Sequence, residues 1–155
     1  MVTIIDYGVG NLNSIKNMLK KIGVEAVISS TTADIESADK LILPGVGSFE
    51  YGMNKLRSSP FFDILQQKVL KNKTPILGVC LGAQLLLNGS EEGQSVPGLG
   101  WIEGKALRFD QGKMADNYKV PHMGWNELQV KKESPLFTDI YNNQRYYFVH
   151  SYHMA

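Results

Sequence analysis

The stretch Ile76–Gln84, with the sequence ILGVCLGAQ, indicates the fold of this chain most clearly. A short apolar run after Pro75 predicts a buried β-strand, and the pattern that follows predicts a helix over 81–87. Cys80 stands between the two elements, with a glycine two residues away on either side. A sharp strand-to-helix turn needs such glycines, because neighbouring backbone segments pass too close for a Cβ atom. The stretch therefore predicts a nucleophile exposed at the C-terminal edge of a sheet.

Short apolar runs alternate with helical patterns through the first half of the chain. There, the expected strands cover residues 2–5, 25–29 and 40–43, and the expected helices cover 15–22, 49–57 and the segment after Pro60. In the second half, the expected strands cover 101–104, 107–109, 127–130 and 146–149. Strands separated by helices of this length predict βαβ units and a parallel sheet. We therefore predict a single α/β domain over residues 1–155, a flavodoxin-like three-layer fold with a central mostly parallel sheet and added mixed or antiparallel strands in the second half.

The composition is that of an ordinary globular protein. The chain has 155 residues, of which 43% are apolar and 20% charged, and its formal net charge is +1. So small a charge gives no strong field toward nucleic acid or an anionic membrane, and no apolar run approaches the roughly 20 residues that span a bilayer. A single cysteine excludes a disulfide framework and a thiol-rich metal site. We expect a cytoplasmic protein without nucleic-acid or membrane partners, because its first residues also lack the basic segment of a signal peptide.

A second glycine-containing loop, Pro44–Gly47 with the sequence PGVG, follows the strand expected at 40–43. Two glycines allow backbone N–H groups to face a ligand, although a plain turn has the same composition. Cys80 taken alone is also compatible with a small buried apolar residue. Both loops follow parallel strands, however, so they are expected at the same edge of the sheet. Gln84, one helical turn beyond Cys80, strengthens the prediction of a site there.

Together, residues 78–84 and 44–47 resemble the class I, cysteine-triad glutamine amidotransferases. Three further stretches are similar to the glutaminase subunits of imidazole glycerol phosphate synthase, an enzyme of histidine biosynthesis. These stretches are DYGVGN at 6–11, PHMGWN at 121–126 and YFVHSY at 147–152. The resemblance covers the chain from end to end, and PHMGWN is its most specific part.

The resemblance implies a role for each matching residue. Cys80 would attack the side-chain amide of L-glutamine, form a thioester and release ammonia, after which water would free glutamate. The oxyanion would be held by backbone N–H groups of Leu81 and, after a peptide rearrangement, of Val46. The residues implied to hold glutamine are Gly47, Gln84, Ser151 and Tyr152. Ammonia would pass to a (β/α)8-barrel cyclase subunit in a heterodimer, with Asn11 and Trp125 facing that partner. No cofactor and no metal ion are expected.

The resemblance is incomplete in the catalytic triad. A cysteine needs a general base, and in this family the base is a histidine followed by Pro-Glu near the C-terminus. None of the three histidines, His122, His150 and His153, is followed by Pro-Glu. We therefore expect that the part carrying the histidine and glutamate lies beyond residue 155, and that these residues alone have negligible turnover. His150 is interpreted as structural, because it lies in an alternating strand pattern.

Three alternatives remain open from the sequence. The chain can be an inactive, truncated binding subunit, or an amidotransferase subunit for surface-polysaccharide sugar modification. It can also be another cysteine hydrolase on a flavodoxin-like scaffold, in which Gln84, Ser151 and Tyr152 would have no role. Glu91 and Glu92, an adjacent acidic pair in a loop, are interpreted as a solvated surface.

Overall fold

The computed structural model describes residues 1–93, 96–113, 119–137 and 144–155, which divide into two units. The first unit comprises Met1–Leu107 together with Met154–Ala155, and the second comprises Arg108–His153. Each unit is described by itself below. That residues 1–155 form one functional domain stays a prediction.

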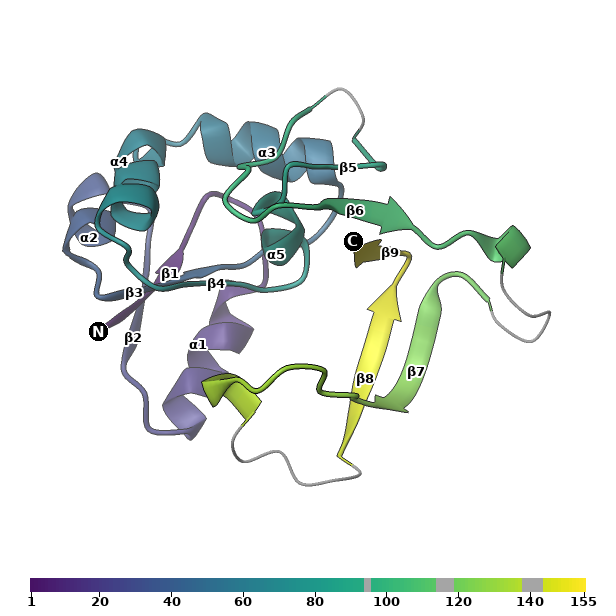
Figure 1. The fold of residues 1–155 in the computed structure, drawn as a ribbon. Helices are drawn as coiled ribbons and strands as arrows, with labels where there is room; N and C mark the ends of the chain where they lie inside the picture. Colours follow the sequence, from purple (N-terminus) through teal and green to yellow (C-terminus); the bar gives the residue numbers. More distant parts are fainter. Residues whose placement is uncertain (94–95, 114–118, 138–143) are drawn as a thin grey trace. The chain divides into compact units, whose positions relative to one another are not determined.

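A four-stranded parallel sheet forms the centre of the first unit (Figure 1). Its strands, in the spatial order β2-β1-β3-β4, are β1 (Val2–Ile5), β2 (Ala26–Ser29), β3 (Lys40–Leu43) and β4 (Ile76–Gly78). The strands are in register through pairs such as Ile4 with Ile28 and Leu43 with Gly78. The predicted parallel sheet is therefore confirmed, with β2 and β4 as its edge strands among the described residues.

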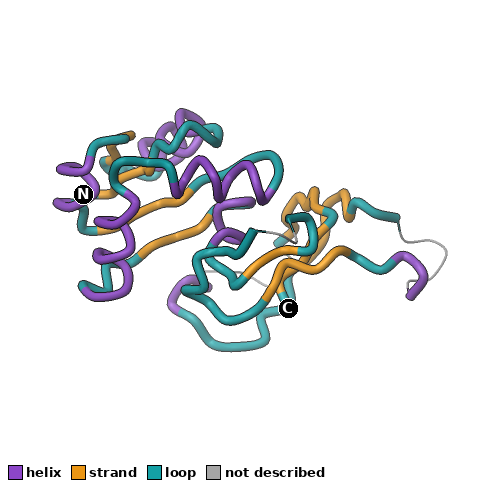
Figure 2. The backbone as a smooth tube through the Cα atoms, turned by 90° about the horizontal axis from the view of Figure 1, so that it is seen from above, coloured by secondary structure: helices purple, strands orange, loops and turns teal. Residues whose placement is uncertain are grey.

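Helices connect these strands, as the alternating pattern predicted (Figure 2). They are α1 (Leu12–Lys21), α2 (Thr32–Ser37), α3 (Phe49–Arg57), α4 (Phe62–Gln66) with a π-helical continuation (Gln67–Lys71), and α5 (Leu81–Leu85). Helix α1 starts three residues earlier than the predicted 15–22, because the side chain of Asn11 caps it. The Asn11 Oδ1 accepts a hydrogen bond from the N–H of Ser14 at 3.3 Å.

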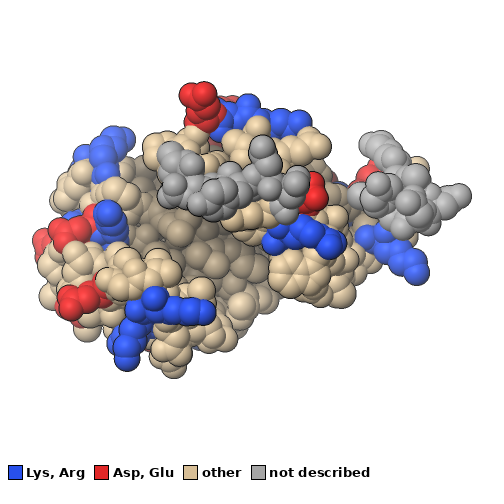
Figure 3. Space-filling view, turned by 90° about the horizontal axis from the view of Figure 1, so that it is seen from below, with Lys and Arg blue, Asp and Glu red and all other residues tan. Residues whose placement is uncertain are grey.

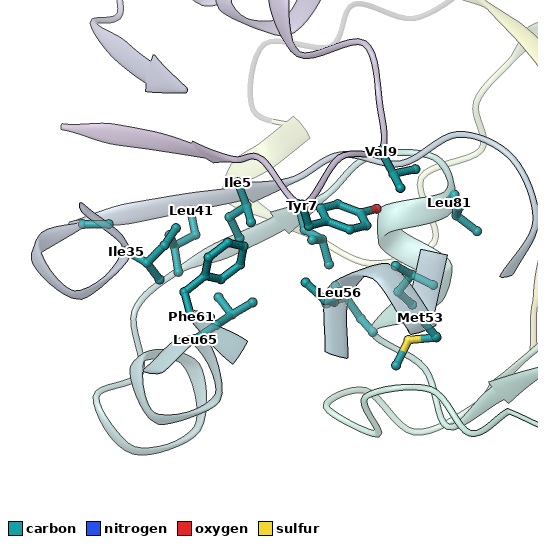
Figure 4. Packing of buried hydrophobic residues seen from close by; sticks show 14 of the residues in the cluster. Ile5, Tyr7, Val9, Ile35, Leu41, Met53, Leu56, Phe61, Leu65 and Leu81 are labelled. Carbon is teal, nitrogen blue, oxygen red and sulfur yellow. The ribbon is translucent and has the colours of Figure 1, made fainter. Parts of the chain in front are cut away.

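The core lies between one face of the sheet and the helices α2 to α5 (Figure 4). Ile5, Leu41 and Leu43 point to this face, because alternate residues of a strand share a side. The side chains that pack against them are Phe61, which precedes α4, and the helical residues Ile35, Met53, Leu56, Leu65, Leu81 and Leu85. Helix α1 packs on β1 and β2 from the other side (Figure 1). The predicted three layers are thus confirmed.

The later strands are shorter and partly differ from the prediction. In the first unit, β5 (Gly89–Ser90) pairs in parallel with β6 (Lys105–Arg108), and Lys105 exchanges two backbone hydrogen bonds with Ala155, at the end of β9 (Tyr152–Met154). The strand predicted at 101–104 is wrong. Its first two N–H groups both donate to the carbonyl of Leu86, which bends the chain.

An antiparallel pair dominates the second unit. Strands β7 (His122–Glu127) and β8 (Arg145–His150) pair along their whole length, from His122 opposite His150 to Glu127 opposite Arg145. The strand predicted at 127–130 is wrong, because the strand lies over the preceding PHMGWN motif and ends at Glu127. Short 3₁₀ turns at Gln111–Lys113 and Pro135–Phe137 complete the unit.

Charged side chains of both signs are spread over the surface. On the face shown in Figure 3, lysine and arginine are interspersed with aspartate and glutamate, in keeping with the net charge of +1. Among the described residues, every helix is too short or too polar to cross a membrane.

Candidate active site

Cys80 occupies a strained bend directly after β4. Its φ of 55° and ψ of −119° are unusual for a residue with a side chain, a conformation that costs about 1–3 kcal/mol. The flanking glycines make the bend possible: a Cβ on Gly82 would lie 1.9 Å from the carbonyl oxygen of Leu43, and one on Gly78 would lie 2.4 Å from the Cα of Ala83. The Cys80 side chain is exposed. The nucleophile turn, Gly78–Gly82, therefore has the geometry that the glycine spacing predicted.

The Pro44–Gly47 loop lies against this turn. A Cβ on Gly45 would lie 2.7 Å from the nitrogen of Gly82 and 2.9 Å from the Cβ of Leu81, so only glycine fits there. Gly47 has a φ of +92°, in the region that favours glycine. Val46 and Gly47 are exposed. The predicted meeting of the two loops at one edge of the sheet is confirmed.

Among the described residues at this edge, two of four backbone N–H groups are available to a ligand. The N–H groups of Gly82 and Ala83 donate to the carbonyls of Val79 and Cys80, at 3.0 Å in both cases. Within the described part of the chain, those of Leu81 and Val46 donate to no acceptor. Unpaired backbone N–H groups beside an exposed thiol are the donors that a developing oxyanion requires.

The helix that follows Cys80 is shorter than predicted. Helix α5 ends at Leu85 rather than at residue 87, because the N–H groups of Leu86 and Leu87 turn back to Ala83 and Gln84. Five residues give only a small helix dipole, so α5 by itself contributes little to stabilising a negative charge at Cys80.

Gln84 carries an unsatisfied polar atom. Its Oε1 is buried and has no hydrogen-bond partner among the described residues. A buried acceptor without a partner costs about 1–3 kcal/mol, and native proteins seldom leave one unexplained. Gln84 is therefore a polar residue near Cys80 whose acceptor the described residues leave unsatisfied.

Two contacts at the Pro44–Gly47 loop could not be found from sequence spacing. The hydroxyl of Tyr7 donates to the carbonyl of Pro44 at 2.6 Å, across 37 residues of sequence. The Glu92 carboxylate accepts from the N–H of Phe49 at 2.9 Å, across 43 residues. Glu92 thereby caps helix α3, where Ser48 makes no side-chain cap. Glu92 is exposed, as its interpretation as a solvated residue implied, but its capping contact was missed because the partner is distant in sequence.

The other predicted site residues lie in the second unit or serve a structural contact. The Ser151 carbonyl accepts from the N–H of Phe109 at 3.0 Å, and the Tyr152 carbonyl accepts from the Nδ1 of His150 at 2.8 Å. The other ring nitrogen of His150 lies 3.0 Å from the Nδ1 of His122. With both nitrogens engaged, the structural interpretation of His150 is supported. Asn11 is exposed while it caps α1.

Comparison with known proteins identifies the family. The profile of the "Glutamine amidotransferase class-I" family matches residues 3–155. "Imidazole glycerol phosphate synthase subunit HisH 2" of Pseudomonas aeruginosa is 50% identical over 155 residues, which cover all of this chain and 75% of that protein. The protein of the same name from Methanococcus maripaludis is 49% identical over 154 residues, or 99% of this chain and 74% of the relative.

A solved structure agrees with the sequence relatives. A "Crystal structure of glutamine amidotransferase" superposes with a TM-score of 0.59 and 25% sequence identity, covering 70% of this chain. The match spans 57% of that chain, so it concerns the part of the fold that the two share. The family match and the curated relatives lead to one conclusion: this chain belongs to the class I glutamine amidotransferases and, among them, to the HisH subunits of imidazole glycerol phosphate synthase.

Proposed function

We propose that this chain is the glutaminase subunit of an imidazole glycerol phosphate synthase and that Cys80 is its nucleophile. Two observations about Cys80 carry the proposal. Its backbone is strained and its side chain is exposed, and the Pro44–Gly47 loop packs closely against the turn that contains it. The reaction hydrolyses L-glutamine to glutamate and ammonia, and the ammonia serves imidazole glycerol phosphate formation in histidine biosynthesis. HisH relatives that match the whole chain support this assignment.

The first step is attack of the Cys80 thiolate on the carboxamide carbon. As the C–S bond forms, the electron pair of the C=O bond moves to oxygen, and the N–H groups of Leu81 and Val46 stabilise this charge. Collapse of the tetrahedral intermediate expels the amide nitrogen, which takes up a proton and leaves as ammonia. A γ-glutamyl thioester remains on Cys80. Water then attacks it, releases glutamate and restores the thiol.

Binding of the substrate falls to a second group of residues. The Oε1 of Gln84, which has no partner among the described residues, accepts a hydrogen bond from an N–H group of glutamine. The remaining residues proposed to hold glutamine, on their match to the family motifs, are Gly47, Ser151 and Tyr152. In this family a histidine and a glutamate of a His-Pro-Glu run move protons. Residues 1–155 contain no such run.

The partner is proposed to be a (β/α)8-barrel cyclase subunit, bound as a cytoplasmic heterodimer. One face of the β7–β8 pair supports this. Trp125 and Tyr147 are paired across the two strands with their rings 5.6 Å apart, and they are 58% and 54% exposed. Met123 and Val149 form the next pair on the same face and are also exposed. An exposed aromatic face of this kind is typical of a protein interface. Asn11 is proposed as a further contact.

Trp125→Ala is expected to weaken binding of the cyclase subunit by about 30-fold, the effect of losing ~2 kcal/mol at a central aromatic contact. The affinity is measured by titration calorimetry with the purified cyclase. Tyr51→Ala is the matched control, because Tyr51 is a similarly exposed aromatic residue on α3. The proposed interface would be contradicted if both variants lost affinity equally, or if neither lost any.

The proposed reaction is tested by covalent labelling, which is unambiguous because the chain has a single cysteine. We expect 6-diazo-5-oxo-L-norleucine, an electrophilic glutamine analogue, to modify Cys80 and to be slowed by L-glutamine but not by D-glutamine. Iodoacetamide, which needs no glutamine pocket, serves as the control reagent. Labelling that L-glutamine does not slow would overturn the proposed function.

A further inference from the structure

Tyr7 is a buried residue that reaches the Pro44–Gly47 loop from the segment after β1. Its side chain is only 6% exposed, and its hydroxyl points toward the helix that carries Leu81 (Figure 4). The hydroxyl donates to the carbonyl oxygen of Pro44 at 2.6 Å, a short and buried hydrogen bond. A Cβ on Gly45 would lie 3.0 Å from the same hydroxyl, so Tyr7 also contacts the next residue of the loop.

The segment from Pro44 to Phe49 is held at both ends, while its middle is exposed. At the first end, Pro44 is fixed by the Tyr7 hydroxyl and by close packing of Gly10, where a Cβ would lie 3.1 Å from the Cβ of Pro44. At the other end, the N–H of Phe49 is held by the Glu92 carboxylate. The residues between Gly45 and Phe49 are exposed.

The surroundings of Tyr7 keep its hydroxyl protonated, so that it can donate a hydrogen bond. Burial, and the negative charge of a nearby Cys80 thiolate, raise the pKa of Tyr7 well above its usual range. The Tyr7 phenol is therefore neutral at neutral pH and keeps the proton that it donates to Pro44. The hydrogen bond to Pro44 is consequently present during attack on the substrate.

We propose that Tyr7 is a positioning residue: its hydroxyl fixes the Pro44–Gly45 peptide against the nucleophile turn, so that rearrangement of the loop begins only at the Gly45–Val46 peptide. The N–H of Val46 then donates to the oxyanion while the preceding peptide is held in place. Tyr7 itself does not touch the reacting atoms. This inference rests on the proposed function, because it concerns the same oxyanion site.

Tyr7→Phe removes only the hydroxyl, and its effect is measured on the chain of 155 residues. The probe is the γ-ethyl thioester of L-glutamate, which acylates Cys80 with release of ethanethiolate and so passes through an oxyanion without protonation of the leaving group. We expect the rate of acylation at saturation to fall about tenfold, less than the ~10²–10³-fold loss on removal of an oxyanion donor itself. The half-saturating concentration and the rate of alkylation by iodoacetamide are expected to stay within twofold.

Two matched variants make the result specific. Tyr51→Phe removes an exposed hydroxyl and is expected to change neither rate. Replacement of Tyr7 by 4-aminophenylalanine keeps a donor at the same position and is expected to restore most of the acylation rate. This rescue also separates a positioning effect from loss of folding.

Two outcomes would overturn the inference: no fall in acylation for Tyr7→Phe, or an equal fall in acylation and alkylation. Failure of the proposed function looks different. In that case the unsubstituted chain itself would show no saturable acylation by the L-thioester, or would react equally with its D-enantiomer.

Discussion

Gly82→Ala is expected to unfold the first unit. The added Cβ would lie 1.9 Å from the carbonyl oxygen of Leu43 and 3.0 Å from the backbone carbon of Pro44, where no flexible side chain can move aside. The nucleophile turn would have to move away from the end of β3, and the packing of Leu81 and Leu85 in the core would be lost. We expect a loss of more than about 4 kcal/mol in the free energy of unfolding, which exceeds the usual effect of one substitution.

Gly89→Ala is the matched control for this prediction. No heavy atom lies within 4 Å of a Cβ built on Gly89, so its effect is expected to stay within about 0.5 kcal/mol. Urea unfolding followed by circular dichroism measures both variants. A folded Gly82→Ala variant with an unchanged midpoint would show that the turn is not packed against β3 as described.

Ammonia release from glutamine is expected to be negligible for residues 1–155, even with the cyclase subunit present. An ordinary cysteine is only a few per cent thiolate at neutral pH, and the departing nitrogen needs a proton. Positioned acid–base groups contribute about 10²–10⁴-fold to such reactions, and no His-Pro-Glu run is present to supply them. We therefore expect turnover lower by that factor than in the Pseudomonas aeruginosa relative.

Both proteins are assayed with a cyclase subunit present, through coupled measurement of glutamate. Iodoacetamide labelling of Cys80 in the same sample confirms that the thiol is accessible, so that a low rate is not a consequence of unfolding. Turnover equal to that of the relative would show that a histidine within residues 1–155, such as His150 or His153, serves as the base after all.

Local sequence was sufficient to predict the nucleophile turn. The spacing of Gly78, Cys80 and Gly82 constrains neighbouring backbone directly, and the structure has the close approaches that this spacing requires. The contact between the turn and Gly45 followed from a further rule, that parallel strands end at one edge of a sheet. Both predictions depended on backbone geometry, which a short motif determines.

Contacts of side chains across long stretches of sequence were not predictable. The hydrogen bond from Tyr7 to Pro44 and that from Phe49 to Glu92 join residues 37 and 43 positions apart. Similarly, the strand over PHMGWN contains Gly124 and polar residues, and therefore lacks a strong strand pattern. Pairing with β8 stabilises it, and that partner lies elsewhere in the chain.

The most direct test of the account is a crystal structure of the chain after reaction with 6-diazo-5-oxo-L-norleucine. We predict a covalent bond from the Cys80 Sγ to the analogue, with its carbonyl oxygen about 2.7–3.1 Å from the nitrogen of Leu81. The Gln84 Oε1 is predicted to accept a hydrogen bond from the bound analogue. An adduct whose carbonyl oxygen faces solvent and contacts neither loop would contradict the assignment of this bend as a glutamine site.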